Sequence, residues 1–459
     1  MKAILILVVL VVVGFISLFV MSGHSAVSIA PTVTTVGVST PVSVQVANPH
    51  GIRSVHAYIE QNGAQYPLLD QSAPSTRFFW KRHETPQTVT FDAGKNKAPN
   101  LKEGTARIVV ETVSNDLRGS SDSASTNVNV VLSAPRVVPD DAQHYVNQGG
   151  MELVTFTASG SWNEAGVKVG KYTFRSFPLP GKGPEQRFSM FAYSWELPPD
   201  LTPVVYARNL AGTEATAHFS FKLFPKKFRV RDVVADDKML EKLVTSVDPT
   251  GQLAPGPDLV SRFDKINTEL RAKNNQQLYD LRMKTEEKIL WNGPFIHWGK
   301  EEANFADVRD WMHNGKKIDR AVHLGFDLSD VQNAPVSAAN DGRVVWAADL
   351  GIYGNCVVVD HGYALQSIYG HMRQIDVKVG DMVKKGQAMG IAGQTGLAGG
   401  VHVHFSMQVD GVQVNPVEWW DEHWIRDRIL SKLAPERITT SMAASSPAKA
   451  VARSHRKRR

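Results

Sequence analysis

The chain has 459 residues, of which 42% are hydrophobic, and its formal net charge is +6. One compact core rarely grows to this size, so we expect several folded domains. The excess positive charge lies after Glu436, where Arg and Lys occur without Asp or Glu, and this argues against a basic nucleic-acid-binding fold. The single cysteine, Cys356, excludes an intrachain disulfide framework, and its apolar neighbours predict a buried side chain.

Residues 1–26 are predicted to form a transmembrane anchor or a signal segment. The uncharged run from Ala3 to Met21 approaches the roughly 20 residues that cross a bilayer as a helix, whereas a cleaved signal peptide usually has a shorter apolar region. Small residues at Gly23 and Ser25 offer a weak cleavage site, so both interpretations stay open, with the anchor favoured by length. Lys2 favours a cytoplasmic N-terminus, which predicts a single-pass protein with all later domains outside the inner membrane.

Two stretches, 27–136 and 137–228, show the alternation of apolar and polar residues that is typical of half-buried strands. Val42, Val44 and Val46 alternate with polar or small residues, and clusters of Gly, Pro, Asn and Asp separate such runs. We interpret the two stretches as tandem immunoglobulin-like β-sandwiches.

The period changes in residues 229–292, which are predicted to form a helical connector that braces the next domain. Apolar residues recur at helical spacing after a favourable helix start at Pro257 and Asp258. These apolar residues are Leu259, Phe263, Ile266, Leu270, Leu278, Leu281 and Ile289.

Strand patterns return in residues 293–432, and residues 433–459 are predicted to be a basic disordered tail. Such a tail could act only through charge, on anionic lipid or a wall polymer. The whole chain is therefore predicted to be mainly β, with an N-terminal transmembrane helix, two immunoglobulin-like sandwiches, a short helical connector and a C-terminal β domain.

Chemistry-bearing residues gather in three short motifs of the C-terminal domain. In His402-Val403-His404 the two imidazoles point to the same face of a strand, which suits either a metal bound by both or a metal ligand beside a proton-transfer group. In His323-Leu324-Gly325-Phe326-Asp327 the His and Asp would lie roughly 13 Å apart on a straight strand, so we expect Gly325 to bend the backbone and bring them together. Each motif alone is weak, because paired surface histidines arise by chance.

Together with Tyr369-Gly370-His371, the motifs offer one carboxylate and several imidazoles, enough for a zinc ion with three protein ligands and an open fourth position. Zinc sites of that kind are catalytic rather than structural. From about Asp307 to Trp420 the chain resembles the M23 family of metallopeptidases, also called LytM or lysostaphin-like, and all five motif positions are filled.

The resemblance implies a LytM-type antiparallel β domain with its site in a groove between loops. It implies that His323, Asp327 and His404 bind Zn²⁺, while His371 and His402 act on the substrate. It also implies hydrolysis of peptide bonds in bacterial peptidoglycan, with cross-links as the first choice. Arg309 resembles a family position in a loop over the groove, where it would contact a substrate carboxylate or form a structural ion pair.

Two other functions remain open. Some LytM-like proteins have lost zinc ligands and regulate other cell-wall hydrolases, although they typically lack several of the five residues. The sandwiches could instead make the chain an adhesion or scaffold protein with a residual enzyme domain. The content of bound zinc discriminates an intact site from a degenerate one.

Overall fold

The computed structural model describes residues 2–75, 84–329 and 333–434, and these residues are mainly β. They divide into two compact units, which are described separately: one comprises residues 1–136 with 159–164 and 207–215, and the other comprises the remainder. The predicted basic tail lies almost entirely outside the described residues. Its first residue, Leu433, instead ends the short helix α7 (Ser431–Leu433) and is buried, so the folded part extends at least to Ala434.

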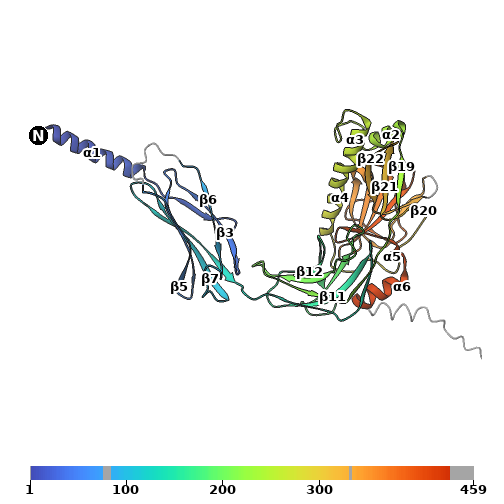
Figure 1. The fold of residues 1–459 in the computed structure, drawn as a ribbon, viewed down its shortest axis with the longest axis horizontal. Helices are drawn as coiled ribbons and strands as arrows, with labels where there is room; N and C mark the ends of the chain where they lie inside the picture. Colours follow the sequence, from blue (N-terminus) through green and yellow to red (C-terminus); the bar gives the residue numbers. More distant parts are fainter. Residues whose placement is uncertain (1, 76–83, 330–332, 435–459) are drawn as a thin grey trace, which may run out of the picture. The chain divides into compact units, whose positions relative to one another are not determined.

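The N-terminal helix α1 runs from Lys2 to Met21 (Figure 1). Over Ile4–Met21 its mean hydropathy is 3.3, and in the described part of the chain it is the one helix long and apolar enough to cross a membrane. A signal sequence has the same properties, so the helix agrees with both interpretations, the membrane anchor and the signal segment.

The first unit contains two sheets that share one apolar core, and their strands are antiparallel except for the parallel pair β2–β8. Val42, Val44 and Val46 are buried, as their alternation predicts, and they pack with Ile59 and Ile108 of the other sheet. The strand orders are β1-β3-β6 and β2-β8-β7-β4-β5. The strands are β1 (Ala26–Ile29), β2 (Thr35–Val36), β3 (Thr40–Ala47), β4 (Ile52–Gln61), β5 (Ala64–Ser72), β6 (Gln87–Ala93), β7 (Gly104–Ser114) and β8 (Ser121–Val130).

A second set of strands follows in the chain, in the orders β14-β15-β11-β9, β13-β12-β16-β17 and β10-β18. The two-layer pattern agrees with a β-sandwich, and its immunoglobulin-like character stays a prediction. The strands are β9 (Arg136–Pro139), β10 (His144–Asn147), β11 (Met151–Ser159), β12 (Glu164–Val169), β13 (Tyr172–Arg175), β14 (Phe177–Pro178), β15 (Gln186–Ala192), β16 (Val204–Arg208), β17 (Glu214–His218) and β18 (Phe221–Phe224).

The predicted helical connector is helical only in part. It begins with strand β19 (Val230–Val234), and Ile289, which was expected to continue the helical pattern, lies beyond the last helical turn. The predicted start is correct, because Asp258 caps the helix by accepting a hydrogen bond from the Ser261 amide at 2.8 Å. The helical segments are α2 (Asp237–Val247), α3 (Leu259–Lys265), a π-helical turn (Ile266–Leu270), α4 (Arg271–Asp280) and a 3₁₀ turn (Leu281–Met283).

Two sheets complete the C-terminal part. A three-stranded sheet has the order β19-β21-β22, and a ten-stranded sheet has the order β20-β23-β30-β27-β26-β25-β28, with β24, β29 and β31 attached off this path. Figure 1 shows α2, α3 and α4 beside the three-stranded sheet. The strands are β20 (Lys300–Ala303), β21 (Asp307–His313), β22 (Lys316–His323), β23 (Phe326–Ser329), β24 (Pro335–Ser337), β25 (Gly342–Asp349), β26 (Asn355–Asp360), β27 (Leu365–Ile375), β28 (Met382–Val383), β29 (Ala388–Ala392), β30 (Val403–Val409) and β31 (Val412–Val414).

Apolar residues of the connector and of the C-terminal strands form one core. Leu240, Leu243 and Phe263 from the helices are buried with Trp311 and Ile368 from the strands. Burying a large apolar side chain contributes about 1.5–3 kcal/mol, so this shared core fixes the helices against the sheets.

Glu418, in the short helix α5 (Val417–Trp420), is buried against the second sandwich. Its carboxylate accepts hydrogen bonds from the Asn147 side chain and the Met151 amide, each at 2.9 Å. Burial raises its pKa to about 7. Two short helical segments follow, α6 (Glu422–Ile425) and a π-helical turn (Arg426–Leu430).

His361 lies in the loop after β26 and is fully buried. Its Nδ1 is 2.8 Å from the carbonyl oxygen of Asp341, and its Nε2 is 2.7 Å from the hydroxyl of Ser367. Burial lowers its pKa to about 4. A neutral, doubly hydrogen-bonded imidazole of this kind is structural.

This burial predicts a pH-dependent stability. Between pH 6.5 and about 4 the unfolded chain protonates His361 whereas the folded chain does not. The contribution of His361 is therefore complete above pH 6.5 and is lost as the pH falls, by up to about 3 kcal/mol. His361→Gln cannot titrate at this position, so only the wild type loses this contribution in acid. The difference in melting temperature between the wild type and His361→Gln should therefore be smaller at pH ~5 than at pH ~7.5. Equal acid losses in both proteins would show that another group is responsible.

Candidate active site

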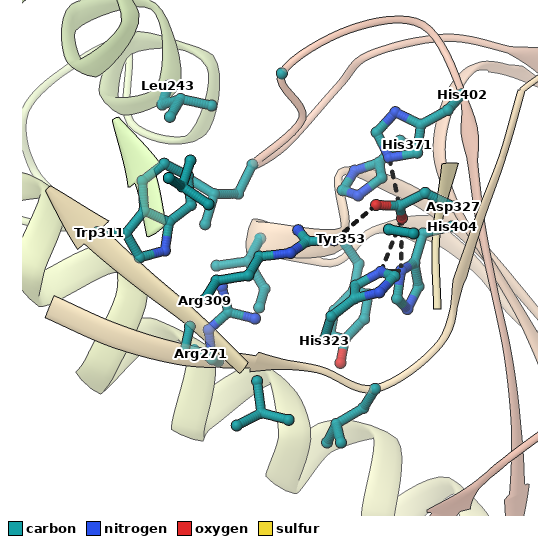
Figure 2. Close-up of a pocket in the computed structure, with 18 of the residues that line it drawn as sticks. Leu243, Arg271, Arg309, Trp311, His323, Asp327, Tyr353, His371, His402 and His404 are labelled. Atoms are coloured by element: carbon teal, nitrogen blue, oxygen red, sulfur yellow. Dashed lines mark hydrogen bonds and ion pairs between the residues drawn. The ribbon is translucent and has the colours of Figure 1, made fainter. Parts of the chain in front are cut away.

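The three motifs meet around one cavity of about 310 Å³ (Figure 2). Sheet register brings them together, because Asp327 on β23 pairs directly with His404 on β30, and Gly370 on β27 pairs with His404 from the other side. His323 ends β22 and reaches the same point from the neighbouring sheet. The structure therefore gathers side chains that lie up to 81 positions apart in the sequence.

Three of the predicted residues converge as a ligand set would. Nε2 of His323 lies 2.8 Å from Oδ1 of Asp327 and 2.9 Å from Nδ1 of His404. Nδ1 of His404 lies 3.4 Å from the same Oδ1. These atoms all fall within 4.8 Å of one another, and the three side chains are buried or nearly so.

Gly325 lies in the backbone bend that the sequence suggested, and it also contributes space beside the site. The chain leaves β22 at His323 and enters β23 at Phe326, so the pair does not lie on one straight strand. A Cβ at Gly325 would lie 2.6 Å from Cε1 of the His404 ring and 2.6 Å from the carbonyl oxygen of Phe405. Glycine at this position therefore lets the His404 ring lie against the backbone.

Backbone carbonyls orient the other imidazoles. Nδ1 of His323 is 3.1 Å from the Asn304 oxygen, Nδ1 of His371 is 2.8 Å from the Thr395 oxygen, and Nδ1 of His402 is 2.9 Å from the Gly400 oxygen. A carbonyl only accepts, so each Nδ1 carries the proton and each Nε2 faces the cavity. His371 has a φ of +63°, an uncommon conformation for a residue other than glycine.

The surroundings set the protonation states of these groups. Burial raises the pKa of Asp327, but His323, His402 and His404 outweigh burial and hold it well below its usual value. Burial lowers the pKa of His371 well below its usual value and that of His404 to about 4, which keeps both neutral. Burial also disfavours the charged form of His402, but its contact with Oδ1 of Asp327 at 3.3 Å prevails and raises its pKa.

Arg309 lies on strand β21, not in a loop as expected, and its guanidinium donates to Oδ2 of Asp327 at 2.9 Å. The other oxygen of that carboxylate faces the imidazoles. Sequence reasoning missed three further residues that line the cavity, Arg231, Arg271 and Tyr353. They lie outside the motifs, and no local pattern marks them.

The donor set fits a zinc ion. Ligand atoms at 2.0–2.2 Å in tetrahedral geometry lie about 3.4 Å apart, close to the 2.8–3.4 Å separations here. Nδ1 of His404 must be deprotonated to bind, which places the proton on Nε2, a buried atom with no hydrogen-bond partner among the described residues. Two imidazoles and one carboxylate leave an open position, as in catalytic zinc sites.

Comparisons with known proteins agree with this geometry. Residues 321–416 match the model of peptidase family M23. The chain is 33% identical over 96 residues to the DD-carboxypeptidase/endopeptidase Mpg of Neisseria meningitidis, covering 21% of this chain and 22% of that protein. It is 32% identical over 142 residues to the peptidoglycan DD-endopeptidase ShyA of Vibrio cholerae, covering 31% of this chain and 32% of that protein.

A solved structure described as a putative peptidase M23 from Pseudomonas aeruginosa is similar over 60% of this chain and 94% of that chain, with 17% identity and a TM-score of 0.36. The chain thus spans less than a third of Mpg and about a third of ShyA. The residues that match the family model include all five motif residues. The chain therefore contains a peptidase family M23 domain at residues 321–416.

Proposed function

We propose that this domain is a zinc-dependent endopeptidase that hydrolyses peptide bonds of bacterial peptidoglycan, with cross-links as the preferred target. The observation that carries the proposal is the convergence of His323 Nε2, Asp327 Oδ1 and His404 Nδ1 beside a second pair of histidines. The match to family M23 and the relatives named as peptidoglycan endopeptidases support the substrate class.

His323, Asp327 and His404 would hold the ion. When bound, zinc supplies Lewis-acid chemistry, polarising a carbonyl and acidifying water. Arg309 would orient Asp327, and the Asn304 carbonyl would orient His323, each through the atom that does not face the ion. A dication beside Asp327 also favours the neutral form of His402, which frees its Nε2 to accept a proton.

His371 and His402 carry the proton transfers, and their ring centres lie 4.9 Å apart. Nε2 of His402 accepts a proton from the attacking water, while the C–O bond forms and the C–N bond breaks. The proton ends on the leaving amine, which receives it from Nε2 of His402 directly or through Nε2 of His371. His371 is neutral at the start, so it can donate to the amine or to the tetrahedral oxygen only after it has received this proton. The Nδ1–H of His402 donates to the Gly400 carbonyl and that of His371 to the Thr395 carbonyl, so only the Nε2 atoms take part in proton transfer.

We infer that α1 anchors the protein in the membrane and that the catalytic domain lies on the periplasmic or extracellular side. The two sandwiches then act as spacers between membrane and wall, and the basic tail contacts anionic lipid or wall polymer. A fusion reporter placed at the C-terminus should be active only on the outer side of the inner membrane.

Digestion of purified peptidoglycan tests the function directly. The full chain should release peptides whose masses correspond to hydrolysed cross-links. Zinc-loaded protein that releases no product, but stimulates a separate cell-wall hydrolase, would favour the regulatory alternative.

The ligand set predicts one zinc ion per chain. His323→Ala, Asp327→Ala and His404→Ala should each lose the ion, because two remaining protein ligands hold zinc poorly. Elemental analysis of dialysed protein measures this, with His313→Ala as a control histidine outside the cavity. Full zinc in any of the three ligand variants would remove that residue from the set.

The packing of Gly325 predicts a second, independent effect on zinc. In Gly325→Ala the added Cβ must displace the His404 ring or the Phe405 carbonyl, so zinc affinity should fall by roughly 10–100-fold. Gly399→Ala is the matched control, because a Cβ there meets nothing within 4 Å although Gly399 also lines the cavity. Competition with a chelator compares the two. Equal affinities would mean that His404 does not need this space.

The division of roles predicts a separation of zinc binding from catalysis. His371→Ala and His402→Ala should keep their zinc and their fold, yet lose about 10²–10⁴-fold in kcat. Zinc content and kcat must be measured on the same preparations. Near-normal kcat would exclude the residue from the reaction, and loss of zinc would make it a ligand.

A further inference from the structure

The cavity extends past the metal ligands to three arginines that the M23 match does not include. Arg231 comes from β19, Arg271 from the start of α4 and Arg309 from β21, and all three line the same cavity as His323 and His404. Figure 2 shows Arg271 and Arg309 on the side of the cavity away from His371 and His402. Three segments distant in sequence therefore bring positive charge to one wall.

Of these three arginines, only Arg309 forms an ion pair with a described residue. Arg309 pairs with Asp327, and Nε of Arg271 donates to the side-chain oxygen of Asn267 at 3.1 Å, which is uncharged. The side chain of Arg231 has no hydrogen bond or ion pair with any described residue, and its Nε is buried. Arg231 as a whole is only partly buried, but a charged side chain that lines a cavity without a protein partner is available to bind an anion.

The charge balance of the cavity is positive. Its acidic lining residues are Asp327, which the zinc ion would use, and Glu302, which is exposed. Asp307, nearby, is already paired with Arg229. Burial lowers the pKa of Arg231 and of Arg271, and the neighbouring charge of Arg309 lowers both further. An anion entering the cavity would relieve this repulsion.

We propose that Arg231 and Arg271, beside Arg309, bind a free carboxylate of the peptide substrate and thereby determine which bond is cut. A planar guanidinium matches a carboxylate in a bidentate geometry. Because the arginines and the proposed metal ligands line one cavity, we place this carboxylate on the residue that follows the scissile bond. This inference rests on the proposed peptidase function, and it adds the substrate feature that the domain selects.

Arg231 offers the clearest test, because its side chain supports no other described residue. Two synthetic cross-linked stem peptides are compared, identical except that the residue after the scissile bond carries a free α-carboxylate or its carboxamide. The full-length, zinc-loaded wild type should cleave the carboxylate peptide with a kcat/KM about 10-fold or more above that of the amide. Arg231→Gln should lose most of this preference through KM, and Arg231→Lys should keep part of it.

Arg320→Gln is the matched control. It removes one positive charge from β22, in the same sheet, but its side chain pairs with Asp310 and does not line the cavity. This variant should retain the preference, and zinc content and melting temperature should be unchanged in the Arg231 variants.

Calorimetry with the same two peptides makes the test independent of cleavage. Tighter binding of the carboxylate peptide by the wild type, lost in Arg231→Gln, supports the subsite even if neither peptide is cut, a result that would sink only the proposed reaction. Equal binding and equal cleavage of both peptides by the wild type overturns the subsite. So does an Arg231→Gln variant that weakens both peptides to the same degree.

Discussion

The carboxylate of Asp327 is the point on which the site depends. It is buried, and a buried carboxylate is costly unless charged or hydrogen-bonded groups surround it. Arg309 holds one oxygen, and the imidazoles of His323, His402 and His404 face the other. The strands that carry these residues must therefore pair in one fixed register. The site lies where β23 and β30 of the large sheet pair and where β22 of the smaller sheet ends.

The imidazoles are oriented mainly by main-chain atoms. The carbonyls of Asn304, Thr395 and Gly400 each accept from one Nδ1–H, and this leaves each Nε2 directed into the cavity. His404 is the exception, because its Nδ1 faces the other ligands and its ring lies over Gly325. In the proposed metal site, His323 would thus bind through Nε2 and His404 through Nδ1, a difference that packing imposes.

The segment between the second sandwich and the peptidase domain does more than connect them. Its helices share an apolar core with Trp311, and its strand β19 extends the sheet that carries Arg309. Arg231 and Arg271 reach the cavity from this segment. The wall of the cavity opposite His371 and His402 is therefore built largely by residues outside the matched M23 domain.

The sequence by itself determined the family of the C-terminal domain, because four histidines and one aspartate occur in three short motifs that can be recognised without the fold. It also determined strand alternation at Val42, Val44 and Val46 and the helix start at Asp258, since both follow from local periodicity and capping. Only the tertiary structure decided that residues 230–234 form a strand, because a strand at the edge of a sheet depends on its partner β21. It likewise decided the roles of Gly325, Arg231 and Arg271, since close packing and shared charge arise between segments that no local pattern connects.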